Sequence, residues 1–196
     1  AEVNSLVNNG AKEITLLGQN VSAYKSDIFN NGKKSKIRLG DLCQILSKIS
    51  GLERIRYLTS HPKDIDDVLI NQHTENKKMM PFLHLPIQSG SDKILMGMNR
   101  KHTKRFYLDL INKIRKKNKN MAFSSDFIVG YPGETDNDFE ETIDLVKKVR
   151  FASSYSFKYS PRPGTPASVK NNFVDPKIAD IRLNKIQKIL NEQQNE

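Results

Sequence analysis

The chain has 196 residues, of which 37% are hydrophobic and 28% are charged, a composition typical of a globular domain. No apolar run approaches the ~20 residues of a membrane span, and a single cysteine, Cys43, excludes an internal disulfide, so we expect a cytoplasmic protein with no membrane partner. The net charge of +10 suits a polyanionic partner such as RNA, although lysine bias from an AT-rich genome would give the same charge.

Short apolar runs alternate along the chain with longer segments of helical periodicity. Strands are predicted at residues 14–17, 55–58, 82–85, 123–129 and 155–159. Helices are predicted at residues 3–10, 39–51, 65–70, from 95 onward, 106–114, 135–149 and 175–189. Thr135 with Asp138 resembles a capping box, and Asp175-Pro176 is a good cap and first-turn pair. The segment from Lys25 to Lys36, rich in Asn, Lys and Ser, is predicted to be a loop excursion.

This alternation favours an α/β fold with a parallel sheet and helices outside it, in one domain covering residues 1–196. A complete eight-stranded barrel needs ~250 residues, and only about five parallel strands are predicted. The chain also opens with a helix, and Ala1 is not an initiator methionine. We therefore expect a partial, TIM-like (β/α) barrel whose first strand is missing and lies upstream of Ala1.

Polar or glycine-rich clusters follow each predicted strand. They are Gly18-Gln-Asn20, Thr59-Ser-His-Pro62, Gln88-Ser-Gly-Ser91, Gly130-Tyr-Pro-Gly-Glu134 and Ser160-Pro-Arg-Pro-Gly164. Because parallel strands end on one rim, where barrel enzymes place their active sites, the clusters predict a ligand-binding opening. Such residues are also common turn formers, so each cluster has a purely structural alternative.

Individual candidates follow from residue chemistry. Gly130 and Gly133 allow a backbone to approach a ligand, and Glu134 suits a ribose hydroxyl or a helix N-terminus. Ser125 and Asp126 are polar groups within a strand, where each needs a partner or a ligand. The remaining candidates are Gln88 and Ser89 for a nucleoside and Arg162, between two prolines, for a carboxylate or phosphate.

No metal site is predicted. The four histidines, His61, His73, His84 and His102, share no metal-ligand spacing, and His84 is expected in the core. Cys43 lies in an amphipathic helix and is expected to be buried and inert. The basic stretch from Arg100 to Lys119 is expected to be mostly a solvated outer helix, with a minority of its cations available to RNA phosphates.

Long motifs carry a resemblance over essentially the whole chain. They are Thr15-Leu-Leu-Gly-Gln-Asn-Val-Ser-Ala-Tyr24, Thr59–Pro62, Leu83-His-Leu-Pro-Ile-Gln-Ser-Gly-Ser-Asp92, Met98-Asn-Arg100, Ser124–Thr135 and Phe157-Lys-Tyr-Ser-Pro-Arg-Pro-Gly-Thr-Pro166. The chain resembles the radical-SAM methylthiotransferases of the MiaB type, which modify tRNA. Gly18-Gln-Asn20 favours the tRNA enzymes over the related enzyme that acts on a ribosomal protein.

The resemblance implies transfer of a methylthio group to C2 of isopentenyl-adenosine beside the tRNA anticodon. It implies S-adenosylmethionine and two [4Fe–4S] clusters as cofactors, and an electron donor such as flavodoxin or ferredoxin. It also implies an N-terminal methylthiotransferase domain and a C-terminal RNA-binding β domain, both absent from this chain. Cofactor contacts are implied at Gln19 and Asn20 and at the candidates above, although Asp126 stands where the family's Gly-x-Ile-x-Gly pattern begins with glycine.

The sequence departs from the family pattern at the radical cluster. It lacks the C-x-x-x-C-x-x-C loop, and one cysteine cannot supply three thiolates, so this piece alone is expected to be inactive. Two other interpretations remain open. One is a methylthiotransferase acting on a ribosomal protein or on threonylcarbamoyl-adenosine in tRNA, and the other is a non-catalytic α/β barrel piece that binds RNA or a nucleotide.

Overall fold

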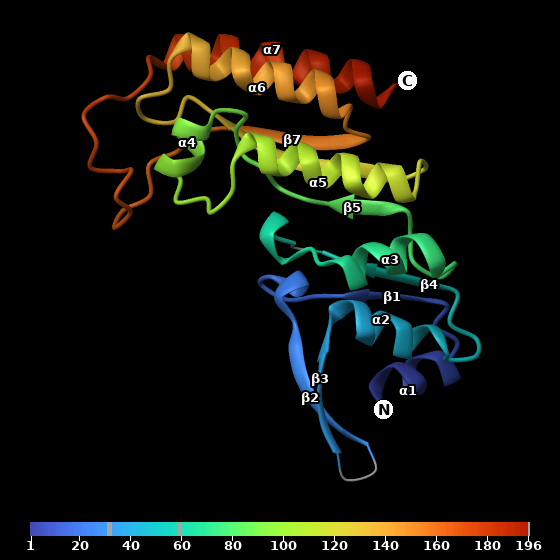
Figure 1. Cartoon of the computed structure of the whole chain (residues 1–196). Coiled ribbons are helices and arrows are strands. Elements are labelled where there is room, and N and C mark those ends of the chain that lie inside the picture. Colours follow the sequence, from blue (N-terminus) through green and yellow to red (C-terminus); the bar gives the residue numbers. More distant parts are fainter. Residues whose placement is uncertain (31–32, 59, 196) are drawn as a thin grey trace. The chain divides into compact units, whose positions relative to one another are not determined.

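The computed structural model describes residues 1–30, 33–58 and 60–195, with the side chains of residues 29, 30 and 33 left out (Figure 1). Thr59, a member of one predicted cluster, lies outside the described residues. The chain divides into two compact units, and each is described by itself. Unit 1 comprises residues 1–84 and 113–121, and unit 2 comprises residues 85–112 and 122–196. The assignment of residues 1–196 to one domain stays a prediction.

Unit 1 is built on a parallel strand pair. β1 (Glu13–Leu16) pairs with β4 (Arg54–Tyr57) so that Ile14 lies opposite Ile55. Besides the hairpin described below, this unit contains α1 (Glu2–Asn8), η1 (Val21–Ala23), α2 (Leu39–Ser47), η2 (Pro62–Asp64), α3 (Asp67–Glu75) and β5 (Phe82–His84). α3 begins at Asp67 rather than at Ile65, because the Asp66 carboxylate caps it by accepting from Leu69 N at 2.9 Å.

The predicted loop excursion at Lys25–Lys36 is wrong. β2 (Lys25–Asn30) and β3 (Lys33–Arg38) form an antiparallel hairpin in which Ser26 lies opposite Ile37. Each strand has one isoleucine beside charged residues, Ile28 after Asp27 and Ile37 between Lys36 and Arg38. In a segment of mostly polar residues, this weak alternation did not predict a strand. In sequence, Asn31-Gly32 is the dipeptide most typical of two-residue hairpins, and this signal was missed.

Unit 2 also has a parallel strand pair. β6 (Ala122–Val129) pairs with β7 (Ser153–Lys158), and residues 85–88 lie along β6, with Leu85 N donating to Ser124 O and Gln88 N to Asp126 O. The helices are α4 (Asp92–Gly97), α6 (Asp136–Val149), α7 (Pro176–Gln194) and the start of α5 (Lys104–Lys117), which ends in unit 1. Parallel strands alternating with helices confirm the predicted α/β class.

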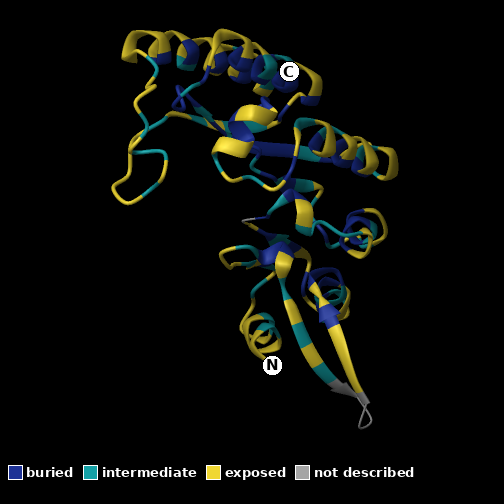
Figure 2. Cartoon of the chain, turned by 60° about the vertical axis from the view of Figure 1, so that its left-hand side comes forward, coloured by how far each residue is buried: buried dark blue, intermediate teal, exposed yellow. Residues whose placement is uncertain are grey.

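The helix starts follow the sequence signals. Thr135 and Asp138 form the predicted capping box of α6, and the Asp175 carboxylate caps α7 through Lys177 N. The apolar face of α6, including Phe139 and Val146, is buried, and the polar face of this helix is exposed to solvent (Figure 2). Phe127 of β6 meets Phe151 edge-to-face at 5.4 Å between ring centroids.

A buried polar cluster lies in unit 1. The Tyr57 hydroxyl and His73 Nε2 are 2.6 Å apart, and both side chains are buried. Burial lowers the pKa of His73 from 6.5 to about 4 and raises that of Cys43, which is fully buried, to about 12. The predicted burial of Cys43 is confirmed, and its raised pKa opposes formation of the reactive thiolate. His84 is only half-buried, so its predicted core position is wrong, because its side chain points away from the face on which Leu83 and Leu85 are buried.

We predict that unfolding free energy falls as the pH drops from about 6.5 to 4. His73 is neutral in the folded state, whereas the unfolded state takes up a proton in this window. The full effect is about 3 kcal/mol. Urea titrations followed by circular dichroism measure it, and His73→Gln should flatten the dependence while His84→Gln preserves it. An unchanged pH dependence in His73→Gln would contradict this assignment.

Candidate functional site

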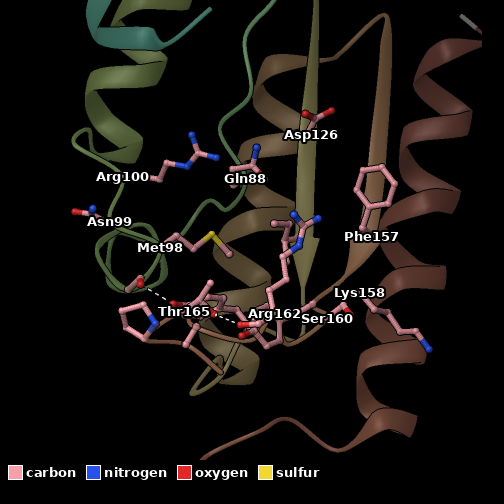
Figure 3. A pocket seen from close by; sticks show the side chains of 16 residues that line it. Gln88, Met98, Asn99, Arg100, Asp126, Phe157, Lys158, Ser160, Arg162 and Thr165 are labelled. Atoms are coloured by element: carbon pink, nitrogen blue, oxygen red, sulfur yellow. Dashed lines mark hydrogen bonds between the residues drawn. The ribbon is translucent and has the colours of Figure 1, made fainter. Parts of the chain in front are cut away.

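Three of the predicted polar clusters contribute to one pocket of unit 2. It is a cavity of about 780 Å³, a size typical of small-molecule sites. Gln88, Tyr131, Ser160 and Arg162 come from the three clusters (Figure 3). The other lining residues are Gly97, Met98, Asn99, Arg100, Asp126, Ile128, Phe157, Lys158, Tyr159, Thr165, Pro166 and Ala167.

Gln88 forms one wall of the pocket in an unusual backbone conformation. Its φ of 80° lies in the left-handed region, which costs a non-glycine residue strain. Hydrogen bonds to β6 on both sides hold it there, from Gln88 N to Asp126 O at 3.0 Å and from Ile128 N to Gln88 O at 2.9 Å. The residue is 7% exposed and lines the cavity. Strain maintained beside a cavity is typical of a functional position.

Two arginines, one lysine and one carboxylate set the charge of the pocket, and the lysine, Lys158, pairs with Asp180. Arg100 and Arg162 extend from different loops toward the strand that carries Asp126 (Figure 3). Burial lowers the pKa of the Arg100 guanidinium, and the Asp126 carboxylate acts in the opposite direction. The carbonyl of Arg162 accepts from Thr165 N at 3.2 Å and from Thr165 Oγ1 at 2.8 Å, which fixes the turn behind it. The pocket therefore offers cations to an anionic group and an acceptor to hydroxyl groups.

Aromatic rings supply part of the apolar lining of the pocket, beside aliphatic residues such as Met98 and Ile128. Tyr131 donates from its hydroxyl to Gly97 O at 2.5 Å and meets Tyr159 edge-to-face at 5.2 Å. The Tyr159 hydroxyl is buried and has no hydrogen-bond partner among the described residues. An unsatisfied buried hydroxyl costs free energy unless a ligand or water pairs with it. Aromatic faces beside polar groups fit a nucleoside.

The segment after Gln88 packs against α6 and does not line the pocket. Ser89 Oγ lies 3.2 Å from Thr142 Oγ1, and Gly90 N donates to the same hydroxyl at 2.9 Å. A Cβ at Gly90 would lie 2.4 Å from Glu141 O, so a side chain has no room. Ser91 Oγ donates to Asp138 Oδ1 at 2.7 Å. The structure gives Ser89 a structural partner, and its predicted contact with a nucleoside stays a prediction.

Three further candidates have structural partners. Ser125 is fully buried, and its Oγ accepts from Ile87 N at 3.0 Å. Gly130 and Gly133 have φ of 72° and 83°, and each approaches a protein neighbour. A Cβ at Gly130 would lie 2.9 Å from Ala179 Cβ, and one at Gly133 would lie 2.6 Å from Asn172 Nδ2. These glycines serve the packing of α7 and the loop before it.

Glu134 is paired inside unit 2. Its carboxylate lies 3.3 Å from Arg182 of α7, and both side chains are buried. Burial raises the pKa of Glu134, against the opposing effect of the Arg182 guanidinium. Glu134 also accepts from Tyr131 N at 3.1 Å, so it fixes the backbone of a pocket residue.

Gln19 and Asn20 belong to unit 1. Gln19 is exposed, whereas the Asn20 amide donates to Asp64 Oδ2 at 2.6 Å and accepts from Ser22 Oγ at 2.7 Å. His61 N donates to the same serine oxygen at 3.1 Å. The two clusters of this unit therefore meet one another, as their position after parallel strands predicts. The predicted cofactor contacts of Gln19 and Asn20 stay predictions.

Sequence reasoning missed part of the pocket. Arg100, Tyr131 and Tyr159 line it but were not among the predicted contacts. Arg100 lies in the motif Met98-Asn-Arg100, and both tyrosines lie in or beside glycine-rich clusters. Their position in or beside these motifs could have predicted that the three residues line the pocket.

The structure provides no metal centre in the described ranges. Across residues 1–30, 33–58 and 60–195, no three His, Cys, Asp or Glu side chains gather in a way that would hold a metal ion. In the same part of the chain, no helix has the length and apolar character required to cross a membrane.

We predict that Gly90→Ala destabilises the protein by at least about 2 kcal/mol, because the new methyl group would overlap the α6 backbone. Gly164→Ala is the matched control: its φ is 81°, but nothing lies within 4 Å of the added Cβ, so only the backbone strain of about 1 kcal/mol remains. Thermal unfolding measures both variants. Equal losses of stability in the two variants would show that Gly90 is not tightly packed.

Comparison with known proteins identifies relatives that are similar in sequence to nearly the whole chain. The chain is 56% identical over 194 residues to the "tRNA-2-methylthio-N(6)-dimethylallyladenosine synthase" of Bartonella quintana, covering 99% of this chain and 42% of that protein. A protein of the same name from Ehrlichia canis is 54% identical, with 96% and 42% covered. The chain thus spans less than half the length of these relatives.

A solved structure supports the fold. A radical S-adenosylmethionine methyltransferase from Kitasatospora setae, solved with cobalamin and a [4Fe-4S] cluster, matches with a TM-score of 0.62 and 12% identity, over 86% of this chain and 32% of that one. The model of the Radical SAM superfamily matches residues 1–146. The chain therefore belongs to the radical SAM superfamily.

Proposed function

We propose that this chain is part of a tRNA methylthiotransferase that adds a methylthio group to C2 of isopentenyl-adenosine beside the anticodon. The observation that supports this most is the 56% identity, over 99% of the chain, to a curated synthase of that name. On this proposal, tRNA is the macromolecular partner, and a flavodoxin or ferredoxin supplies electrons. The chain contributes part of a barrel that holds S-adenosylmethionine.

The pocket of unit 2 fits an adenosyl group. Its aromatic rings suit the adenine, and Asp126 and Gln88 suit ribose hydroxyls. Arg100 and Arg162 suit the carboxylate of the methionine part, because guanidinium groups pair with carboxylates in a bidentate manner. The unpaired Tyr159 hydroxyl gives the ligand a further hydrogen-bond partner. When bound, S-adenosylmethionine supplies the adenosyl and methyl groups of the reaction.

An iron–sulfur cluster does not fit the residues of this chain. Such a cluster is held by several thiolates, and the sequence has one cysteine, which is buried and carries a raised pKa. The cluster ligands are therefore not among these 196 residues, and we expect the chain by itself to be inactive.

The nucleoside profile of tRNA tests the proposed function. The full-length gene containing this chain, expressed in a bacterial strain that lacks its own synthase, should restore 2-methylthio-N6-isopentenyl-adenosine in tRNA digests analysed by mass spectrometry. Restoration of methylthio-threonylcarbamoyl-adenosine instead, or of a modified ribosomal protein, would assign the chain to the related enzymes.

We predict that Arg100→Gln in the full-length protein weakens S-adenosylmethionine binding about 10- to 100-fold, because it removes a charge-assisted hydrogen bond worth about 1.5–3 kcal/mol. Isothermal titration calorimetry measures the change. Arg105→Gln is the matched control: this side chain lies at the start of α5, is 92% exposed and pairs only loosely with Asp109 at 3.8 Å. Equal affinities in both variants would remove Arg100 from the site.

A further inference from the structure

The β2–β3 hairpin forms an exposed two-stranded ribbon in unit 1. Its register runs from Lys25 opposite Arg38 to Asn30 opposite Lys33. Six residues per strand span about 20 Å. Figure 1 shows the ribbon extending away from β1 and α2, and Figure 2 shows its described residues largely exposed or half-buried. This ribbon is an arm rather than a core element.

The two faces of the ribbon differ in chemistry. Strand residues alternate between faces, so Ser26, Ile28 and Ile37 share one face, and Ile37 is buried on it. The opposite face exposes Lys25, Asp27, Lys34, Lys36 and Arg38. Along β3, three of these cations follow one another two residues apart, at a spacing of about 6.8 Å. We call this the basic ribbon face.

The basic ribbon face has more positive charge than its own carboxylates balance. This face carries four Lys or Arg (Lys25, Lys34, Lys36 and Arg38) and one Asp, a net charge of +3, against +10 for the whole chain. Asp27 pairs with Lys34 at 2.9 Å, and Arg38 pairs with Asp66 at 3.0 Å. In the described ranges, neither Lys25 nor Lys36 forms an ion pair, although Asp27, which pairs with Lys34, lies directly opposite Lys36 in the register.

The pairing of β2 with β3 also brings two positive charges close together on the basic ribbon face. Lys25 lies directly opposite Arg38, and like charges at opposed positions of a ribbon are destabilising. Asp66 already pairs with Arg38, and an anion lying along the face would further reduce this repulsion. The arrangement therefore fits a negatively charged partner.

The ribbon arises at the functional end of its sheet. It follows the carboxyl end of β1, after the Gly18-Gln-Asn20 cluster and η1. The Asn20–Asp64 hydrogen bond and the contact of His61 N with Ser22 Oγ tie its base to the segment that follows β4. Barrel enzymes bind their substrates at this edge, so a substrate is well placed to reach the ribbon.

We propose that the basic ribbon face binds the phosphate backbone of the RNA substrate. This inference rests on the proposed function, which makes tRNA the substrate. Evenly spaced lysines suit phosphates, whereas protein interfaces are depleted in lysine and enriched in aromatic residues at their centres. Backbone contacts of this kind give affinity that falls with salt.

The test compares RNA binding by full-length wild type and the double variant Lys25→Gln/Lys36→Gln. The probe is a fluorescein-labelled anticodon stem–loop RNA, followed by anisotropy over a series of salt concentrations. Two lost phosphate contacts should reduce the slope of log K against log salt by about 1.4–1.8. At about 0.1 M salt the affinity should fall about tenfold or more. S-adenosylmethionine affinity should not change.

The control is Lys147→Gln/Lys188→Gln, which removes the same charge from exposed positions on α6 and α7 and should keep the wild-type slope. Wild type that fails to bind the RNA would overturn both this inference and the proposed function. Wild-type binding with an unchanged slope in the ribbon variant would overturn the inference alone. Loss of affinity for an acidic redox protein, with RNA affinity intact, would also overturn it.

Discussion

The packing of unit 2 depends on the close approach of Gly90 to the backbone of α6. No side chain fits there, since an added Cβ would meet Glu141 O at 2.4 Å. The neighbouring serines then bond to Thr142 and Asp138. Burial opposes the ionised form of Asp138, but hydrogen bonds from Lys93, Thr135 and Ser91 hold its pKa well below the usual range. One polar network therefore connects the turn to the start of α6.

The pocket follows from this anchoring. With Ser89, Gly90 and Ser91 held on α6, Gln88 remains in its strained conformation between β6 and the cavity. Just beyond the carboxyl end of β6, Glu134 fixes the backbone of Tyr131 and pairs with Arg182 of α7. Residues that do not line the pocket thus position those that do. Glycines and serines among the predicted ligand contacts help to determine where the pocket-lining side chains lie, and their own contacts with a ligand stay predictions.

The sequence predicted the elements better than the contacts. Apolar periodicity located all five predicted strands and the caps at Thr135 and Asp175, because these signals are local. It failed at Lys25–Lys36, where a hairpin carries mostly polar residues. It also failed to separate Gly130, which packs on Ala179, from Arg162, which lines the cavity. A glycine beside a helix and one beside a ligand look alike in sequence, because the difference depends on non-local packing.

On the proposed function, the cavity between β6, β7 and the loop after β7 binds the adenosyl part of S-adenosylmethionine. Hydrogen–deuterium exchange on the full-length protein, with and without S-adenosylhomocysteine, tests it most directly. We expect ligand protection to be concentrated in the segments 97–100 and 157–167, which contain most of the residues that line the cavity. Protection confined to other segments, with these two unchanged, would contradict it.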